Sequence, residues 1–325
     1  MPLDPQAESV LAMIKKANLP EMWQLTPEQA REQYLLRVAK LATKEEIFRA
    51  HDRRIPGPER DLTIRVYEPR EAKPGERFPI LVWFHGGGFV IGNLETHDHA
   101  CRALSTQAHC LVVAVDYRLA PEFRFPAAVD DCMAVLRWLA LHALEIGGDP
   151  TRIAVGGDSA GGNLAAVCAI LARNDGYPPL AFQLLIYPCT APEPETASHR
   201  KFAEGYVLTR NTITWFYKQY LRSPRQCDDF RFAPLVADDL ANLPPALVLV
   251  AGYDPLRDEG VDYAKRLIEA GNHVTLVNYE GMVHGFLLMG GAIDAAKRAI
   301  AQSAAAVRAA LTNGNQVQSN VGRMT

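Results

Sequence analysis

The serine at position 159 stands in a setting that suits a nucleophile. Residues 157–161 read Gly-Asp-Ser-Ala-Gly, and they join a short strand-like run at 152–156 to a small-residue helical run at 163–169. A serine on such a sharp strand–turn–helix connection is exposed for attack, and flanking glycines leave room for the strained backbone. The competing interpretation is an ordinary glycine-rich turn in which Ser159 only caps the helix.

A glycine-rich loop supplies the hydrogen-bond donors that such a nucleophile needs. The buried strand expected at residues 79–84 leads into His85 and three consecutive glycines. Amides without a neighbouring Cβ can face the oxyanion of a tetrahedral intermediate, and losing one such donor costs about 2.7–4 kcal/mol of barrier. We expect the amides of Gly87, Gly88 and Ala160 to form this oxyanion hole. His85 is expected to order the loop rather than to transfer protons.

An acid and a histidine follow, each just past the end of an expected strand. Asp254 comes after the apolar run at 246–251, and His284 comes after the strand expected at 274–279. Open α/β sheets place their sites at the carboxyl ends of their strands. The three residues can therefore form a triad, in which His284 takes the proton of Ser159 and Asp254 orients the imidazole.

Two other aspartates compete with Asp254 for the role of the acid. Asp158 lies on the turn itself, beside Ser159, so it cannot also reach the far side of the histidine. Asp258 is in the same loop as Asp254, but it falls one helical turn later, inside the next helix. Pro255 suits the first turn of that helix. We therefore predict that Asp254 is the acid.

These motifs together resemble the hormone-sensitive-lipase-like family of α/β-hydrolase carboxylesterases (bacterial family IV), in its GDSAG branch. The matching stretches are His85–Gly88, Asp116–Glu122, Phe125–Ala128, Gly157–Asn163, Asp254–Glu259 and His284–Phe286. The resemblance implies a mostly parallel eight-stranded sheet flanked by helices, with a helical cap over the active site. It also implies a serine esterase for short- to medium-chain acyl esters, and this chemistry needs no metal or cofactor.

Three alternatives to the esterase prediction remain to be weighed, and the sequence argues against them to different degrees. The same triad could hydrolyse amides or lactones, which the sequence barely distinguishes from esters. A non-catalytic ligand receptor shares the fold, as in the plant gibberellin receptor, which lacks the catalytic histidine. The presence of Ser159 and His284 argues against that alternative. A dehalogenase or epoxide hydrolase would need a carboxylate at position 159.

The hydrophobic pattern predicts an α/β core. Strands are expected at residues 45–51, 62–67, 79–84, 110–115, 152–156, 182–187, 246–251 and 274–279. The first two suit an antiparallel edge pair, because residues 62–67 alternate between apolar and polar side chains. Helical patterns separate most of the others, which is typical of a parallel sheet.

Two helical regions add to this core. We expect residues 1–45 to contribute helices to a cap, 191–225 to be a cap insertion, 46–190 and 226–313 to form the catalytic core, and 314–325 to be a disordered tail. Phe89, Tyr206, Trp215 and Phe216 are expected to line the substrate pocket. An aromatic helix could instead simply bury itself on the sheet.

Composition narrows the partners to small molecules. The chain has 325 residues, 48% of them hydrophobic, and a net charge of −3. No basic patch predicts nucleic-acid binding, and no apolar run approaches the roughly 18 residues of a membrane span. His97 and His99 would face different sides of a helix, so no metal site is expected. Without a recognisable secretory signal we expect a cytoplasmic protein that acts on a small-molecule ester, and a homodimer is left open.

Overall fold

One twisted sheet forms the centre of the protein in the computed structural model, which describes residues 2–321, with side chains through Thr312. Its strand order is β1-β2-β4-β3-β5-β6-β7-β8. β2 runs antiparallel to both of its neighbours, and every other described pair is parallel. The strands are β1 Arg49–Ile55, β2 Leu62–Glu68, β3 Phe78–Phe84, β4 Leu111–Asp116, β5 Gly148–Asp158, β6 Phe182–Ile186, β7 Ala246–Tyr253 and β8 Val274–Val283.

The first strand lies later in the chain than the sequence predicts. Its ladder with β2 runs from the pair Arg49 and Glu68 to the pair Ile55 and Leu62, so it continues up to the turn before β2. The prediction of residues 45–51 was wrong because β1 is a charged, largely exposed edge strand with little apolar alternation. Its pairing with β2, rather than its own pattern, sets its bounds.

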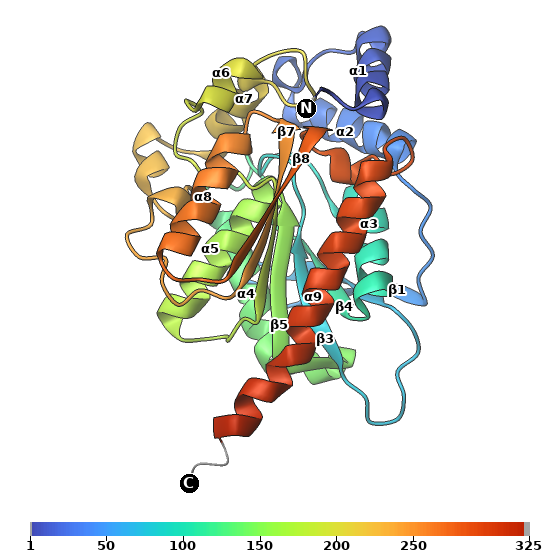
Figure 1. Ribbon diagram of the computed structural model, residues 1–325, viewed down its shortest axis with the longest axis vertical. Coiled ribbons are helices and arrows are strands. Elements are labelled where there is room, and N and C mark those ends of the chain that lie inside the picture. Colours follow the sequence, from blue (N-terminus) through green and yellow to red (C-terminus); the bar gives the residue numbers. More distant parts are fainter. Residues whose placement is uncertain (1, 322–325) are drawn as a thin grey trace.

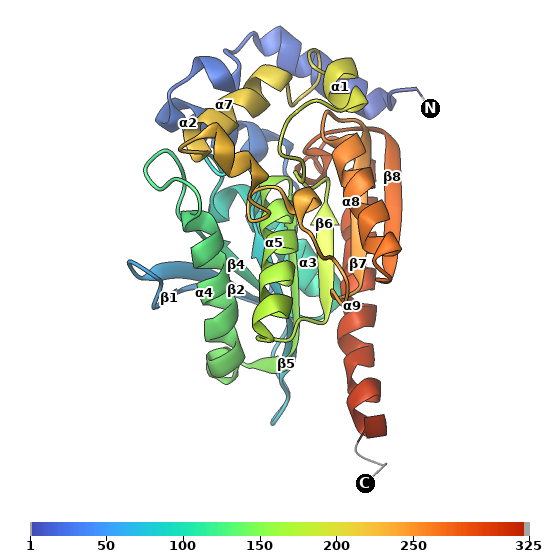
Figure 2. The ribbon, with the colours of Figure 1, turned by 90° about the vertical axis from the view of Figure 1, so that its left-hand side faces the viewer.

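Helices cover both faces of the sheet, with α3 and α9 on one face and α4, α5 and α8 on the other (Figures 1 and 2). β3 illustrates why, because Leu81 and Trp83 point to the first face while Ile80, Val82 and Phe84 point to the second. The helices are α1 Pro5–Ala17, α2 Pro27–Leu41, α3 Leu94–Ala108, α4 Ala127–His142, α5 Ala160–Asp175, α6 Ala197–Lys201, α7 Arg210–Tyr220, α8 Arg257–Glu269 and α9 Asp294–Val321.

The last helix extends into the segment for which the composition predicts disorder. The backbone of α9 stays helical through Val321, so residues 314–321 continue an established helix. Adding residues to an existing helix costs far less than starting one, which local composition does not reveal. Residues 322–325, the rest of the predicted tail, lie outside the described residues.

Four helices, α1, α2, α6 and α7, gather at one end of the sheet, and we call them the upper helices (Figures 1 and 2). Thr26 and Gln29 form a capping box at the start of α2. The hydroxyl of Thr209, which caps α7, donates a hydrogen bond of 2.9 Å to the carboxylate of Glu21. This bond joins the N-terminal segment to the segment between β6 and β7, two regions that are far apart in the sequence.

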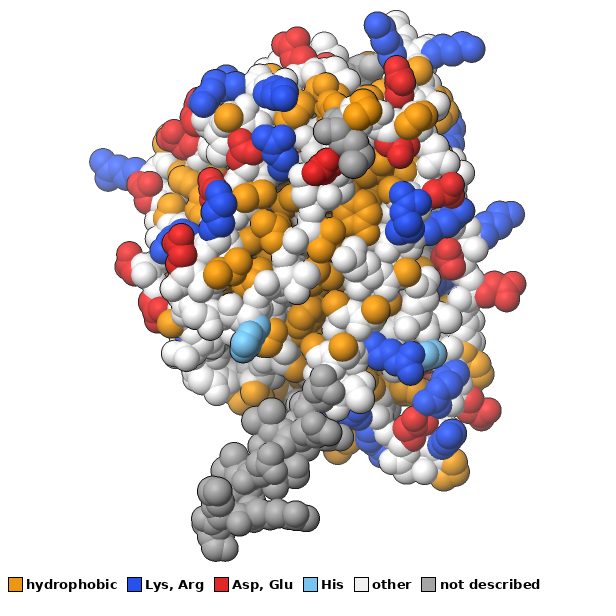
Figure 3. Space-filling view, in the orientation of Figure 1, with side chains coloured by type: hydrophobic (Ala, Val, Ile, Leu, Met, Phe, Trp, Pro, Cys, Tyr) orange, Lys and Arg blue, Asp and Glu red, His pale blue; other side chains and the backbone are white. Residues whose placement is uncertain are grey.

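On the face seen in Figure 3, hydrophobic side chains gather in the middle and charged side chains stand mainly around the rim. The described Lys and Arg side chains of this face are interspersed with Asp and Glu. No helix within the described residues is both long enough and apolar enough to cross a membrane.

Candidate active site

Ser159 occupies the turn between β5 and α5, in a backbone conformation that few residues adopt. Its φ is 56° and its ψ is −118°. Such a conformation costs a non-glycine residue on the order of 1–3 kcal/mol, so the surroundings must enforce it. A Cβ on either Gly157 or Gly161 would collide with the carbonyl oxygen of Phe84. The two glycines therefore let the turn pack closely on the end of β3.

A continuous hydrogen-bond chain joins Ser159, His284 and Asp254. The Ser159 hydroxyl lies 3.0 Å from Nε2 of His284, and Nδ1 of the same ring lies 2.7 Å from Oδ2 of Asp254. The other oxygen of Asp254 accepts the amide of Leu256 at 2.8 Å. Asp254 is fully buried and His284 is 8% exposed. The carboxylate therefore fixes the ring with Nε2 turned to the serine.

The glycine loop after β3 brings backbone amides to the same place. Gly87 and Gly88 have φ angles of 127° and 60°, which side-chain-bearing residues rarely adopt. Both glycines and Ala160 line the pocket that contains Ser159 and His284. Among the described residues, no acceptor is recorded for the amides of Gly87 and Gly88, and Ala160 begins α5, where amides lack an intrahelical partner. These donors are available to a ligand.

His85 and Asp158 hold this loop from behind. His85 stacks on Tyr117 at 4.2 Å, and its Nδ1 lies 2.9 Å from the carbonyl oxygen of Gly86. Burial lowers the pKa of His85 to about 3, so the ring is neutral. The Gly86 amide donates to Oδ1 of Asp158 at 2.9 Å, and Nε2 of His97 lies 3.0 Å from the same oxygen.

Asp158 therefore remains a buried anion. Burial alone would raise the pKa of Asp158, but the charge and hydrogen bond of His97 and the amide of Gly86 hold it below its usual value. The carboxylate beside the nucleophile faces away from the Nδ1 of His284 and supports the glycine loop instead. Within the described residues, no group of three or more His, Cys, Asp or Glu side chains is placed to hold a metal ion.

Comparison with known proteins places this geometry in a family. The profile of a family described as "alpha/beta hydrolase fold" matches residues 81–288. Esterase LipI of Mycobacterium tuberculosis is 42% identical over 269 residues, which cover 81% of this chain and 83% of that protein. Ethyl acetate hydrolase of Pseudomonas putida is 41% identical over 237 residues, 72% of this chain and 74% of that protein.

Solved structures agree. The hyperthermophilic esterase from Pyrobaculum calidifontis superposes with a TM-score of 0.90 at 42% identity, covering 95% of this chain and 99% of that one. An α/β-hydrolase enzyme from the Lake Arreo metagenome superposes with a TM-score of 0.91 at 40% identity, over 94% and 98% of the two chains. This chain belongs to the hormone-sensitive-lipase-like family of α/β-hydrolase carboxylesterases. It is a carboxylic ester hydrolase.

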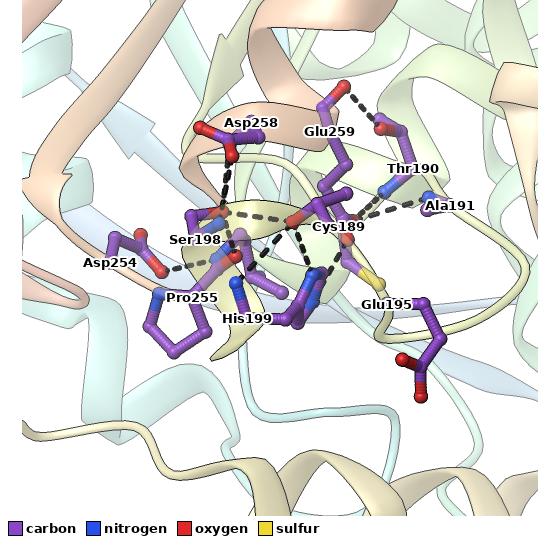
Figure 4. Close-up of polar contacts among 12 residues, drawn as sticks. Cys189, Thr190, Ala191, Glu195, Ser198, His199, Asp254, Pro255, Asp258 and Glu259 are labelled. Atoms are coloured by element: carbon purple, nitrogen blue, oxygen red, sulfur yellow. Dashed lines mark hydrogen bonds and ion pairs between the residues drawn. The ribbon is translucent and has the colours of Figure 1, made fainter. Parts of the chain in front are cut away.

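The rival acid of this esterase, Asp258, is engaged elsewhere. Its Oδ2 accepts the backbone amide of Ser198 in α6 at 2.8 Å, and the Ser198 hydroxyl donates to the carbonyl oxygen of Pro255 at 2.6 Å. Figure 4 shows Asp258 turned toward Ser198. Asp254 instead hydrogen-bonds to His284. Asp258 thus ties an upper helix to the core and takes no part in the triad geometry.

A second acidic residue anchors the same region of the esterase. Glu259 is fully buried, and its Oε1 accepts the amides of Thr190 at 2.5 Å and Ala191 at 3.2 Å. Its Oε2 lies 3.2 Å from Nε2 of the equally buried His199 in α6 (Figure 4). Asp258 and Glu259, neighbours on the first turn of α8, therefore both hold the segment that carries α6.

The pocket above the triad is lined mostly by apolar side chains, and of the upper helices α2 and α7 contribute to its wall. It encloses about 910 Å³ of empty space, including its open mouth. Of the four predicted lining residues, Phe89 and Phe216 line it, and the Phe216 ring packs directly against Gly88. Tyr206 and Trp215 do not. Tyr206 packs against Phe202 and Tyr253, and Trp215 lies one helix position away from the face that Phe216 presents.

Sequence reasoning expected residues 1–45 to contribute helices to a cap, but it named none of the α2 side chains that line this pocket. Tyr34, Arg37, Val38 and Leu41 all line it. Their spacing of three and four residues marks one face of the helix, and a charged residue on an otherwise apolar face was the available signal. The pairing of His97 with Asp158 was also missed, because nothing in the local pattern of either residue points to the other.

Proposed function

We propose that Ser159 attacks the carbonyl carbon of an ester while His284 takes its proton. The C–O bond to the alcohol then breaks, and His284 returns the proton to the leaving alcohol. Water then attacks the acyl carbon while His284 removes one of its protons. The bond from that carbon to Ser159 Oγ breaks, His284 returns the proton to Oγ, and the carboxylic acid leaves. Asp254 keeps the ring in the required tautomer and stabilises the imidazolium. The single observation that carries this proposal is the hydrogen-bond chain from Ser159 Oγ through His284 to Asp254.

The amides of Gly87, Gly88 and Ala160 would stabilise the oxyanion of each tetrahedral intermediate. They border the same pocket as the serine, and donors aimed at developing negative charge are worth more in a site that excludes water. Ala160 adds the positive end of the α5 dipole. His85 would act only by ordering the loop, in agreement with its neutral, stacked ring.

We also infer that the upper helices form a cap over residues 46–190 and 226–313, and that the preferred acyl groups are short to medium in length. Phe216 and Phe89 narrow the pocket beside the oxyanion donors, which supports the preference. The relative named ethyl acetate hydrolase also supports it, since acetate is a two-carbon acyl group.

A panel of p-nitrophenyl esters from acetate to palmitate tests this function. We expect kcat/KM to peak at short or medium acyl chains and to fall for the longest ones, with a burst of p-nitrophenol as the acyl-enzyme accumulates. Efficient hydrolysis of emulsified long-chain triglyceride would contradict the proposed preference. No release from any of the esters would contradict the proposed function itself.

The cytoplasmic location and the homodimer remain predictions from the sequence alone. Light scattering coupled to size-exclusion chromatography measures the oligomeric state directly, and cell fractionation measures the location.

A further inference from the structure

An arginine with no carboxylate partner lines the catalytic pocket. Arg37 projects from α2 into the lining, and no ion pair or hydrogen bond of its guanidinium is found within the described part of the chain. Its recorded neighbour is the ring of Tyr34, whose centroid lies 5.4 Å from Cζ. Arg31 on the same helix differs, because its guanidinium donates two hydrogen bonds, of 2.8 and 2.7 Å, to the carboxylate of Glu122.

The charge of Arg37 is uncompensated in a half-buried position. Burial lowers the pKa of Arg37, yet an arginine side chain stays cationic at neutral pH. Removing a charge from water without a partner is unfavourable, so Arg37 gains from an anion bound in this pocket. A planar guanidinium also presents a fork of donors that matches a carboxylate.

Tyr34 supplies a second donor beside this guanidinium. It lies three residues before Arg37, on the same face of α2, and it lines the same pocket. No hydrogen bond of its hydroxyl is recorded among the described residues. Burial and the nearby charge of Asp158 raise the pKa of Tyr34, so the hydroxyl keeps its proton and can donate it.

The other charged groups of the pocket do not neutralise Arg37. Asp158 is the one acidic side chain among the described lining residues, and His97 and the Gly86 amide already satisfy it. His284 is paired with Asp254. The remaining walls near α2 are aliphatic, for example Val38 and Leu41, which suits a hydrocarbon chain between two polar groups.

We propose that Arg37, assisted by Tyr34, binds a carboxylate of the substrate, so that the preferred esters carry a carboxylate a short aliphatic chain away from the ester group. This inference rests on the proposed esterase function. The preferred substrates are then esters that bear one free carboxylate, and Arg37 is a specificity-determining residue outside the triad. The carboxylate could belong to the acyl part or to the alcohol part, and two substrate pairs distinguish these sources.

The acyl arm compares monomethyl adipate with methyl 6-oxoheptanoate, in which a methyl ketone replaces the carboxylate. The alcohol arm compares 5-acetoxypentanoate with 6-acetoxyhexan-2-one in the same way. Each arm gives the ratio of kcat/KM for the acid to that for the neutral ketone. We expect Arg37→Met to lower the ratio about tenfold or more in one arm, the size expected for a lost charge-assisted hydrogen bond. The ratio for Arg37→Lys should lie between those of the wild type and Arg37→Met, because lysine keeps the positive charge but lacks the forked pair of donors.

Lys40→Met is the matched control, since it removes an exposed positive charge from the same helix without touching the pocket. Its ratios should equal those of the wild type. Thermal unfolding of each variant confirms that the fold is intact. Ratios that stay within about twofold of the wild type in both arms for Arg37→Met would overturn the inference.

A binding measurement separates this inference from the proposed function. Calorimetry on Ser159→Ala compares the affinities of the acid and ketone of each pair, and the double variant Ser159→Ala with Arg37→Met repeats it. We expect preferential binding of one acid that disappears with Arg37. Equal affinities for acid and ketone in both pairs would refute the carboxylate site. If the wild type failed to hydrolyse even the neutral keto esters, while Ser159→Ala still bound one acid preferentially, only the esterase function would be refuted.

Discussion

The floor of the active site, which carries Ser159, Asp254 and His284, and the upper helices above it are held in different ways. On the floor, each reactive side chain follows a strand end and has several fixed contacts, as Asp254 has with His284 and the Leu256 amide. The upper helices are tied by separate side-chain links, such as Ser198 with Asp258, Thr209 with Glu21 and Arg31 with Glu122, and they also pack through apolar side chains. The reacting side chains are therefore fixed by hydrogen bonds at strand ends, whereas much of the pocket wall comes from side chains of separate helices.

The largest expected effect is the loss of the nucleophile on the floor. Ser159→Ala should lower kcat by about 10⁶, and His284→Ala by a similar factor, because the members of a triad act as a unit. Ser223→Ala, an exposed serine on the surface after α7, serves as the control and should retain full activity. Initial rates on p-nitrophenyl butyrate give all three values. Near wild-type activity in purified Ser159→Ala would contradict the assignment of Ser159 as the nucleophile.

The two aspartates after β7 sharpen the comparison, since one belongs to the floor and the other holds an upper helix. Asp254→Asn should lower kcat by about 10⁴, because the amide favours the wrong tautomer of His284. Asp258→Asn should cost about 1 kcal/mol of stability by weakening the bond to Ser198, with little change in kcat. Rates and denaturant unfolding are measured on both variants. A large loss of kcat in Asp258→Asn, with little loss in Asp254→Asn, would reverse the assignment of the acid.

Substitution of Asp158, which supports the glycine loop, should have a smaller effect on kcat. Asp158→Ala removes the acceptor of the Gly86 amide and the partner of His97, so the oxyanion donors lose their fixed position. We expect kcat to fall about 10²-fold, close to the cost of one lost donor. Asp158→Asn keeps an acceptor for Gly86 and should lose less. Equal kcat in Asp158→Ala and the wild type would show that the loop does not need this anchor.

The last effect concerns stability rather than rate, and it appears on acidification. Burial lowers the pKa of His99 to about 4, whereas a histidine in the unfolded chain titrates near 6.5. The unfolded chain therefore binds more protons as the pH falls below about 6.5, and the free energy of unfolding decreases. Between pH 7 and pH 5 this histidine contributes a loss of at most about 2 kcal/mol. Denaturant unfolding of His99→Gln at both pH values should show a smaller decrease than the wild type; an equal decrease would refute the assignment.

The sequence predicted the floor better than the upper helices, and the reason is physical. Ser159, Asp254 and His284 lie just past apolar strands, and parallel strands bring their carboxyl ends to one edge. Local sequence is therefore enough to place them together. The charged edge strand β1 carries no such pattern, and its bounds depend on its pairing with β2.

The pocket wall depends instead on how separate helices dock. Trp215 and Phe216 are both aromatic residues of α7, but only the docked orientation decides that Phe216 enters the pocket. Arg37 lies on α2, far in sequence from every motif of the floor. Tertiary packing brings it to the pocket, and no spacing within one segment could have revealed that.

Covalent labelling with diethyl p-nitrophenyl phosphate tests the central claim most directly. Peptide mass mapping should find one diethylphosphoryl group per chain, on Ser159, with release of one equivalent of p-nitrophenol. Ser159→Ala should take up none, and Asp254→Asn should react much more slowly than Asp258→Asn. A label on another residue at the wild-type rate, or unchanged labelling of Ser159→Ala, would contradict the triad of Ser159, His284 and Asp254.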